Sequence, residues 1–204
     1  MATVYVNAYQ SYDALGRALE RKAEFERHRI FYSLIYSALD TRLCIERTLF
    51  EYFVIINNKE LSRKMEKLYR ATDLKREILQ EEPEFFRKLE FIRLLAPFCG
   101  INEPIVPPDL ELLSSSYGLI GGYLHAPKRP QVWGDREWWL RLKLALNETL
   151  AHLVQIHMGH MGKIDLNAAG RDLFARFSSG ELSSDDLVRE FEKTSTVKTR
   201  RPKP

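Results

Sequence analysis

The sequence predicts an all-α protein, an antiparallel helical bundle with a small two-helix extension at its C-terminal end. Apolar residues recur with the period of amphipathic helices along most of the 204 residues. Glycine and proline, which interrupt helices, are scarce through the first ninety residues. No segment keeps up the apolar–polar alternation of a strand, and only the four residues TVYV near the start resemble one.

Caps and helix breakers divide this pattern into segments. Ser11 or Asp13 can cap the first helix, Asp109 a middle one, and Ser183 or Ser184 the last. Pro83 suits the first turn of another helix. We expect helices over roughly residues 14–29, 30–56, 59–69, 72–79, 84–98, 109–125, 136–158, 168–180 and 185–193. The first two can be continuous, and the proline-rich stretch 101–108 is expected to be an extended connector.

Three parts follow from this pattern. Residues 8–162 are expected to form the bundle, and residues 163–194 the two-helix extension. Residues 195–204 read as a disordered basic tail, because they hold four Lys or Arg and no acid. Subtracting these four charges from the formal net charge of +3 leaves −1, so the folded part lacks the strongly basic composition typical of a nucleic-acid-binding domain. A local basic patch remains possible.

Cysteine usage and hydropathy bear on the compartment. Cys44 and Cys99 are the only cysteines and form no C-x-x-C pattern, which favours a reducing cytoplasm over a disulfide-bonded secreted protein. No apolar run reaches the ~18 residues that span a bilayer. The first residues lack the basic and apolar regions of a secretory signal. We therefore expect a cytoplasmic protein that is not embedded in a membrane.

Arg42 and Glu46 are the first candidate site. On a helical wheel of residues 30–57 they fall within a broad apolar face, whereas Arg47 and Glu51 fall on the polar face opposite. Charges on an apolar face are costly unless they are paired, and the i,i+4 spacing allows these two to pair. They are either a structural ion pair or two residues that face a cleft or a subunit interface.

His125 is the second candidate, at the end of the segment YGLIGGYLHAP (residues 117–127). Gly121 and Gly122 weaken helix propensity by ~1 kcal/mol each and let a backbone or ligand approach closely. Tyr123 and His125 can both point into such a space. His125 is either a helix-end residue that bonds a carbonyl or a general acid/base that titrates near neutral pH.

Two other kinds of site find less support. Glu148, His152, His157 and His160 have metal-ligand spacing, but the wheel separates Glu148 and His152 from His160, so no metal or other cofactor is predicted. The tryptophans at 133, 138 and 139 are expected to be core or loop anchors rather than a base-stacking platform. No phosphate-binding glycine loop, nucleophile elbow or zinc-protease motif occurs in the sequence.

The order of these features resembles the HEPN superfamily of small prokaryotic helical bundles. The resemblance rests on RLCIERTLFE (residues 42–51) and on a later helix that ends in histidine, SSYGLIGGYLHAP (residues 115–127), and it covers roughly residues 10–160. Many HEPN proteins act in toxin–antitoxin or antiviral abortive-infection systems. Active members are metal-independent endoribonucleases that work as homodimers. Their signature is an arginine, four to six residues of any kind, and a histidine at the dimer cleft.

The histidine of that signature corresponds to His125, but its arginine is missing. Positions 118–120, which should carry it, hold Gly, Leu and Ile. By this resemblance His125 handles protons, Arg42 or Arg129 supplies the cation for the phosphate, and Glu46 orients Arg42. Tyr123, Arg129 and Ser116 are the expected substrate-binding neighbours.

The alternative reading is a non-enzymatic helical module for dimerisation or protein interaction. In that case Arg42 and Glu46 only fix helix packing, His125 caps its helix, and the C-terminal helices contact a protein partner. This alternative predicts a contiguous apolar surface patch and no effect of His125→Ala on any activity.

Overall fold

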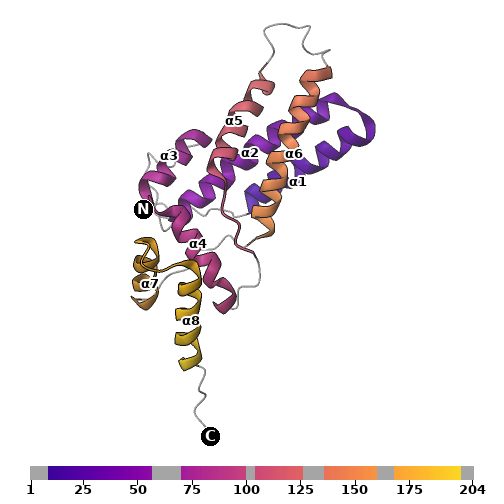
Figure 1. The fold of residues 1–204 in the computed structure, drawn as a ribbon. Helices are drawn as coiled ribbons and strands as arrows, with labels where there is room; N and C mark the ends of the chain where they lie inside the picture. The colour runs from indigo at the N-terminus through magenta and orange to yellow at the C-terminus, as the bar shows by residue number, and fades with distance from the viewer. Residues whose placement is uncertain (1–8, 57–69, 100–103, 126–135, 160–167, 199–204) are drawn as a thin grey trace. The chain divides into compact units, whose positions relative to one another are not determined.

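The computed structural model describes residues 9–56, 70–99, 104–125, 136–159 and 168–198 (Figure 1). In this part of the chain every regular element is a helix, which confirms the all-α fold class. The elements are α1 (Tyr9–His28), α2 (Phe31–Ile56), α3 (Ala71–Glu81), α4 (Phe85–Leu95), the 3-10 helix η2 (Ala96–Cys99), α5 (Leu110–Leu124), α6 (Arg136–Met158), α7 (Ala168–Ser178) and α8 (Ser184–Lys198). The helix expected over 59–69 lies outside the described residues.

The chain forms two compact units. Unit 1 comprises residues 1–81 and 108–157 and contains α1, α2, α3, α5 and α6. Unit 2 comprises residues 82–107 and 158–204 and contains α4, η2, α7 and α8. These boundaries differ from those expected from the sequence, because α4 packs with α7 and α8 rather than with the other early helices. Among the described helices, none is both long enough and apolar enough to cross a bilayer.

Helices α1 and α2 form an antiparallel hairpin, and the chain breaks between them. Arg29 adopts a left-handed backbone conformation with φ of 58°, and its N–H donates to the Phe25 carbonyl at 2.8 Å. This is the αL type of helix C-cap. It separates α1 from α2, so the two helices are not continuous.

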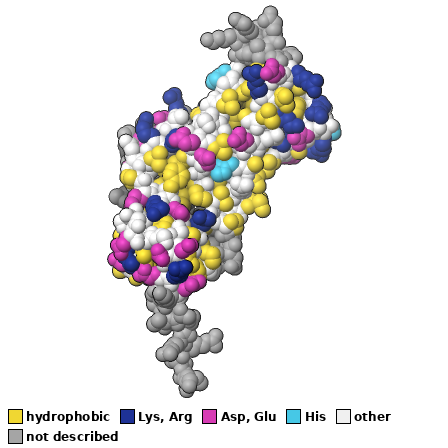
Figure 2. Space-filling model, in the orientation of Figure 1, with side chains coloured by type: hydrophobic (Ala, Val, Ile, Leu, Met, Phe, Trp, Pro, Cys, Tyr) yellow, Lys and Arg dark blue, Asp and Glu magenta, His cyan; other side chains and the backbone are white. Residues whose placement is uncertain are grey.

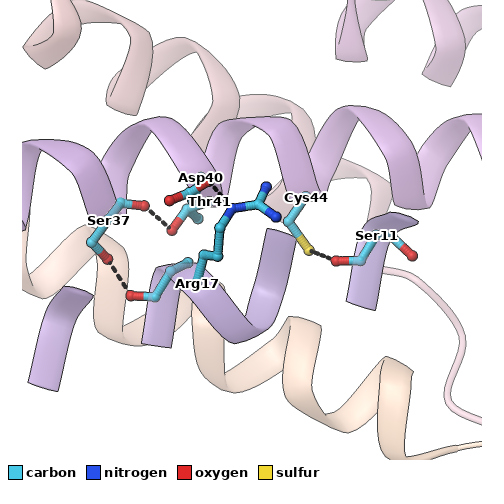
Figure 3. Close-up of polar contacts among 7 residues, drawn as sticks. Ser11, Arg17, Ser37, Asp40, Thr41 and Cys44 are labelled. Atoms are coloured by element: carbon cyan, nitrogen blue, oxygen red, sulfur yellow. Dashed lines mark hydrogen bonds and ion pairs between the residues drawn. The ribbon is translucent and has the colours of Figure 1, made fainter. Parts of the chain in front are cut away.

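Small polar side chains of α2 lie in the α1–α2 interface (Figure 3). The Ser37 hydroxyl donates to the Ala18 carbonyl at 2.7 Å, and the Thr41 hydroxyl donates to the Ser37 carbonyl at 2.7 Å. Glu51, which the wheel places on the polar face, is only 5% exposed here. The wheel shows which residues are polar but not how small their side chains are. Small hydroxyl side chains let two helices approach closely, and this face of α2 is buried.

Helices α5 and α6 complete unit 1. The Asp109 carboxylate accepts from the Leu112 N–H at 2.8 Å and caps α5 as the sequence predicted. Helix α5 packs on α2 and α3. The buried side of α6 carries mostly apolar residues: Trp139, Leu142, Leu146, Thr149, Leu150, Leu153 and Ile156.

Unit 2 has a core of its own. Phe91 of α4 and Phe177 of α7 are fully buried, with ring centroids 5.8 Å apart. The Arg87 guanidinium lies 4.0 Å from the Phe177 ring centroid and donates to the Phe177 carbonyl. Ser183 caps α8 by accepting from the Asp186 N–H at 3.2 Å. Helix α8 continues to Lys198, inside the stretch expected to be a disordered tail, and residues 199–204 lie outside the described part.

Candidate functional site

Arg42 and Glu46 meet Tyr117 where α2 packs against α5. Arg42 Nη2 donates to the Tyr117 hydroxyl at 2.6 Å, and that hydroxyl donates to Glu46 Oε1 at 2.6 Å. Arg42 Nε lies 3.7 Å from Glu46 Oε1, which is an ion pair but too long for a hydrogen bond. The Arg42 side chain is 28% exposed and that of Glu46 is 19% exposed, so the cluster borders solvent.

Tyr117 makes this cluster rigid. The Arg42 guanidinium carbon lies 4.2 Å from the Tyr117 ring centroid, a cation–π contact. Tyr117 itself is only 7% exposed. Burial, followed by the hydrogen bond to Glu46, raises the pKa of the Tyr117 hydroxyl. The hydroxyl therefore stays protonated at neutral pH and can donate to the carboxylate.

Gly121 provides the space for the guanidinium. A Cβ atom at position 121 would lie 3.0 Å from Arg42 Nη1 and 3.7 Å from its guanidinium carbon. A Cβ atom at the neighbouring Gly122 would meet nothing within 4 Å. A Cβ atom at 121 would therefore make the guanidinium give way by a few tenths of an ångström, whereas one at 122 would meet no neighbour.

Arg42 retains hydrogen-bonding capacity. A guanidinium carries five N–H donors. Within the described part of the chain, the Tyr117 hydroxyl is the only acceptor to which Arg42 donates. The cluster thus holds a partly exposed cation in a fixed position with several donors open to solvent. Planar phosphate and carboxylate groups are the usual ligands of such an arginine.

His125 is the C-cap residue of α5, with φ of −83° and ψ of 138°. It is exposed and makes no hydrogen bond or ion pair with the described residues. It follows Gly121 by four residues, about one helical turn or ~6 Å along the axis. The structure gives no direct contact between His125 and Arg42. The guanidinium nevertheless reaches α5 about one turn before the histidine.

The other residues predicted for the site lie in different settings. Tyr123 is half-buried, and its ring packs edge-on against Trp138 with centroids 4.9 Å apart. Burial raises the pKa of the Tyr123 hydroxyl. Ser116 is 7% exposed, so its hydroxyl is not offered to the surface. Arg129 lies outside the described residues.

A chain of aromatic contacts links the end of α5 to the α1–α2 turn. The ring of Tyr123 contacts Trp138, which contacts Trp139 with centroids 4.6 Å apart. Trp139 contacts Phe31 at 4.7 Å, and Phe31 contacts Phe25 at 5.8 Å. Trp139 is 7% exposed, as expected for a core anchor, whereas Trp133 lies outside the described residues. These contacts place the α1–α2 turn and the end of α5 at the same end of unit 1.

That turn is basic. Arg27, His28 and Arg29 are consecutive and exposed, and Figure 2 shows Lys and Arg side chains gathered there. Arg27 donates to the Ala23 carbonyl at 3.4 Å, and Arg29 lies 5.9 Å from the Phe25 ring centroid. Within the described residues neither arginine pairs with an acid. The run of three basic residues is visible in the sequence and was missed there as a candidate phosphate contact.

A second polar network is buried between α1, α2 and α6. Glu51 accepts from the Ser11 hydroxyl at 2.5 Å and from the Ser11 N–H at 3.3 Å. His157 Nε2 lies 3.2 Å from the Thr48 hydroxyl and 3.9 Å from Cys44 Sγ. Burial raises the pKa of Glu51 to about 7 and that of Cys44 to about 12. A fully buried thiol with so high a pKa is no nucleophile, so the network is structural.

The histidines considered as metal ligands have separate partners. His152 Nε2 accepts from the Asp109 N–H at 2.8 Å, whereas His157 lies against Thr48. Burial lowers the pKa of both imidazoles. Glu148 is exposed, and His160 lies outside the described residues. Among the residues that the structure describes, no three potential ligands are arranged to hold a metal ion.

An open depression of about 450 Å³ lies between α3 and α5. Its basic residues are Lys75 and Arg76. Lys75 pairs with Glu111 at 2.5 Å, and Arg76 pairs with Asp73 at 3.3 Å. These acids lie closer to their cations than the 3.7 Å that separates Glu46 from Arg42, so the depression is a poorer anion site than Arg42.

Comparison with known proteins adds no evidence on the family or the function. No family model, curated protein or solved structure matches the chain. The functional argument therefore rests on the residues and their geometry.

Proposed function

We propose that unit 1 is a HEPN-like module that binds RNA and cleaves it without a metal ion. Arg42 contacts the scissile phosphate, His125 handles the proton, and Glu46 orients Arg42 through Tyr117. One observation carries the proposal: the Arg42 guanidinium is held against Gly121, with donors open, one helical turn before His125. A cation supplied by α2 would thus replace the arginine that the family signature has on the histidine's own helix.

The chemistry needs only groups that this end of unit 1 carries. His125 takes the proton of a ribose 2′-hydroxyl, and the 2′-oxygen bonds to the adjacent phosphorus as the bond from phosphorus to the 5′-oxygen of the next nucleotide breaks. The protonated His125 then gives that proton to the leaving 5′-oxygen, and a 2′,3′-cyclic phosphate is left. The charge on the phosphate oxygens is offset by Arg42. Arg27 and Arg29 in the basic turn add contacts to the phosphate backbone of the RNA, which do not depend on the base sequence.

The test is an RNA cleavage assay in EDTA. The full chain is incubated with end-labelled structured and unstructured RNAs beside a His125→Ala variant. Asn147→Ala is the control, because Asn147 is an exposed polar residue of α6 to which the proposal gives no role. We expect cleavage by wild type and by Asn147→Ala, and a loss of about 10²-fold or more for His125→Ala. Cleavage that survives His125→Ala would contradict the proposal.

A second candidate function is dimerisation, favoured by an apolar row on the outer side of α2. Tyr32, Tyr36 and Leu39 are 70%, 54% and 45% exposed, and the half-buried Leu43 and Phe50 continue the row. The first four of these residues are spaced by four, three and four, and Phe50 follows Leu43 by seven residues, which is the periodicity of a helix–helix seam. If the α2 helices of two copies pack antiparallel about a two-fold axis, Leu39 of one copy faces Leu43 of the other. We propose a homodimer joined through this face.

Light scattering after size exclusion tests this dimer. Leu39→Asp should shift the protein from dimer to monomer. Leu144→Asp is the control, because Leu144 is 58% exposed on α6, which packs on α2 from the Thr48 side. A wild-type monomer, or a dimer that survives Leu39→Asp, would refute this interface. A dimer that binds no RNA would favour the non-enzymatic interaction module.

The remaining expectations belong to the same proposal. Cysteine usage favours the cytoplasm, and the HEPN resemblance favours a role in prokaryotic defence or in a toxin–antitoxin pair. Such a role implies a protein partner in addition to RNA. Mass spectrometry of proteins that co-purify with the tagged chain from its own host tests that partner directly.

A further inference from the structure

Tyr117 separates two opposite charges that would otherwise bond directly. Its hydroxyl accepts from Arg42 and donates to Glu46, each at 2.6 Å. Since the Nε–Oε1 distance between Arg42 and Glu46 is 3.7 Å, the carboxylate forms no hydrogen bond with the guanidinium. The N–H donors of Arg42 that bond to no described residue are therefore left free for a ligand, although a carboxylate lies beside them.

We infer that Glu46 is a built-in competitor for the phosphate at Arg42, so that RNA binding at this site works against a resident carboxylate. The inference rests on the proposed function and concerns how that same site is regulated. Glu46 holds Arg42 and Tyr117 in place when no ligand is bound. An incoming phosphodiester oxygen must bind the same guanidinium within the field of that negative charge.

The size of the effect follows from the distances. At about 4 Å a pair of unit charges interacts several times more strongly near a protein surface than in bulk water. Both side chains are partly exposed, at 28% and 19%, which places this pair between the two limits. A phosphate on the far side of the guanidinium lies further from Glu46 and is repelled less. Removing the charge of Glu46 should therefore tighten RNA binding about fivefold or more.

A purely structural role for Glu46 predicts a different result. Glu46→Gln keeps an amide oxygen that can accept from Tyr117, so the guanidinium stays against Gly121. If Glu46 only positions Arg42, this variant binds RNA with unchanged or lower affinity. If Glu46 competes, the variant binds more tightly, and the gain depends on Arg42.

The experiment is fluorescence anisotropy of a labelled single-stranded 2′-O-methyl oligoribonucleotide at fixed ionic strength. This probe has no free 2′-hydroxyl, so it stays intact while its binding is measured. The proteins are the full-length wild type, Glu46→Gln, Glu20→Gln and the double variant Arg42→Gln/Glu46→Gln. Glu20 is exposed on α1 and pairs with no described residue, so Glu20→Gln controls for the change in net charge. Circular dichroism checks that every variant is folded.

We expect Glu46→Gln to bind about fivefold more tightly than Glu20→Gln, and the double variant to lose that gain. Equal or weaker binding by Glu46→Gln, with the wild type still binding, would overturn the inference and leave the proposed function standing. A gain in RNA affinity that persists in the double variant would also overturn the inference, because Glu46 would then not be competing for Arg42. If neither the wild type nor Glu46→Gln binds RNA, the proposed function fails first and the inference with it.

Discussion

Arg42 Nη1 lies 3.0 Å from the point where a Cβ atom of Gly121 would be, so the guanidinium of α2 occupies the place of a side chain on α5. This contact ties the candidate phosphate ligand to the helix that carries His125. It also explains why a glycine, which costs ~1 kcal/mol in a helix interior, sits at a buried position of α5.

The two adjacent glycines should respond differently to alanine. Gly122→Ala should raise the free energy of unfolding by ~1 kcal/mol through helix propensity alone, because nothing lies within 4 Å of the new methyl group. Gly121→Ala should gain less or lose stability, because the methyl group crowds the guanidinium of Arg42, which must shift by a few tenths of an ångström. Urea unfolding of both variants measures the difference. Equal stabilisation would show that Arg42 does not depend on Gly121.

The buried Glu51 predicts a specific pH dependence of stability. Burial raises its pKa from 4.5 to about 7, so the folded state binds its proton more tightly than the unfolded state does. The contribution of Glu51 to the free energy of unfolding should therefore be greatest below about pH 4.5, fall as the pH rises to about 7, and stay low above it. The fall is on the order of 3 kcal/mol.

Glu51→Gln should remove this fall. Urea unfolding at pH 5 and pH 8 should show the variant gaining stability relative to the wild type at the higher pH. Glu148→Gln, at an exposed position of α6, is the control. Its free energy of unfolding should differ from that of the wild type by the same amount at both pH values. A parallel pH dependence in the wild type and in Glu51→Gln would mean that Glu51 is not the titrating group.

The small side chains between α1 and α2 predict a packing defect. Ser37→Val adds volume at a fully buried position and removes the donor to the Ala18 carbonyl, which should cost roughly 1–3 kcal/mol. Ser115→Val, at an exposed position of α5, should cost only a few tenths of a kcal/mol from helix propensity. Thermal or urea unfolding measures both. A tolerated Ser37→Val would indicate a looser α1–α2 contact than the structure shows.

The basic α1–α2 turn predicts a change in salt dependence. Arg27→Gln should weaken RNA binding equally for different sequences and reduce the slope of log affinity against log salt by about 0.7. Titrations at three salt concentrations measure the slope. Arg189→Gln, an exposed arginine of α8, should leave it unchanged. The same slope for wild type and Arg27→Gln would remove this turn from the interface.

Local signals in the sequence were enough to predict the helices of the described part. The caps at Asp109 and Ser183 and the i,i+4 spacing of Arg42 and Glu46 act within one or two turns. Tyr117 was not predicted as the third member of the cluster, because it lies 75 residues from Arg42 in the chain. The burial of Glu51 was also missed, since only packing against α1 shows that the hydroxyl-rich face of α2 is an inner face.

The most direct test of the central claim asks whether Arg42 and His125 act in one site. Single-turnover RNA cleavage in EDTA is measured for the wild type, Arg42→Lys, His125→Ala and the double variant. The account predicts that each single variant loses about 10²-fold or more, and that the double variant is hardly slower than the slower single one, because residues that act as a unit are not additive. Full activity in either single variant, or fully additive losses in the double variant, would contradict a shared site.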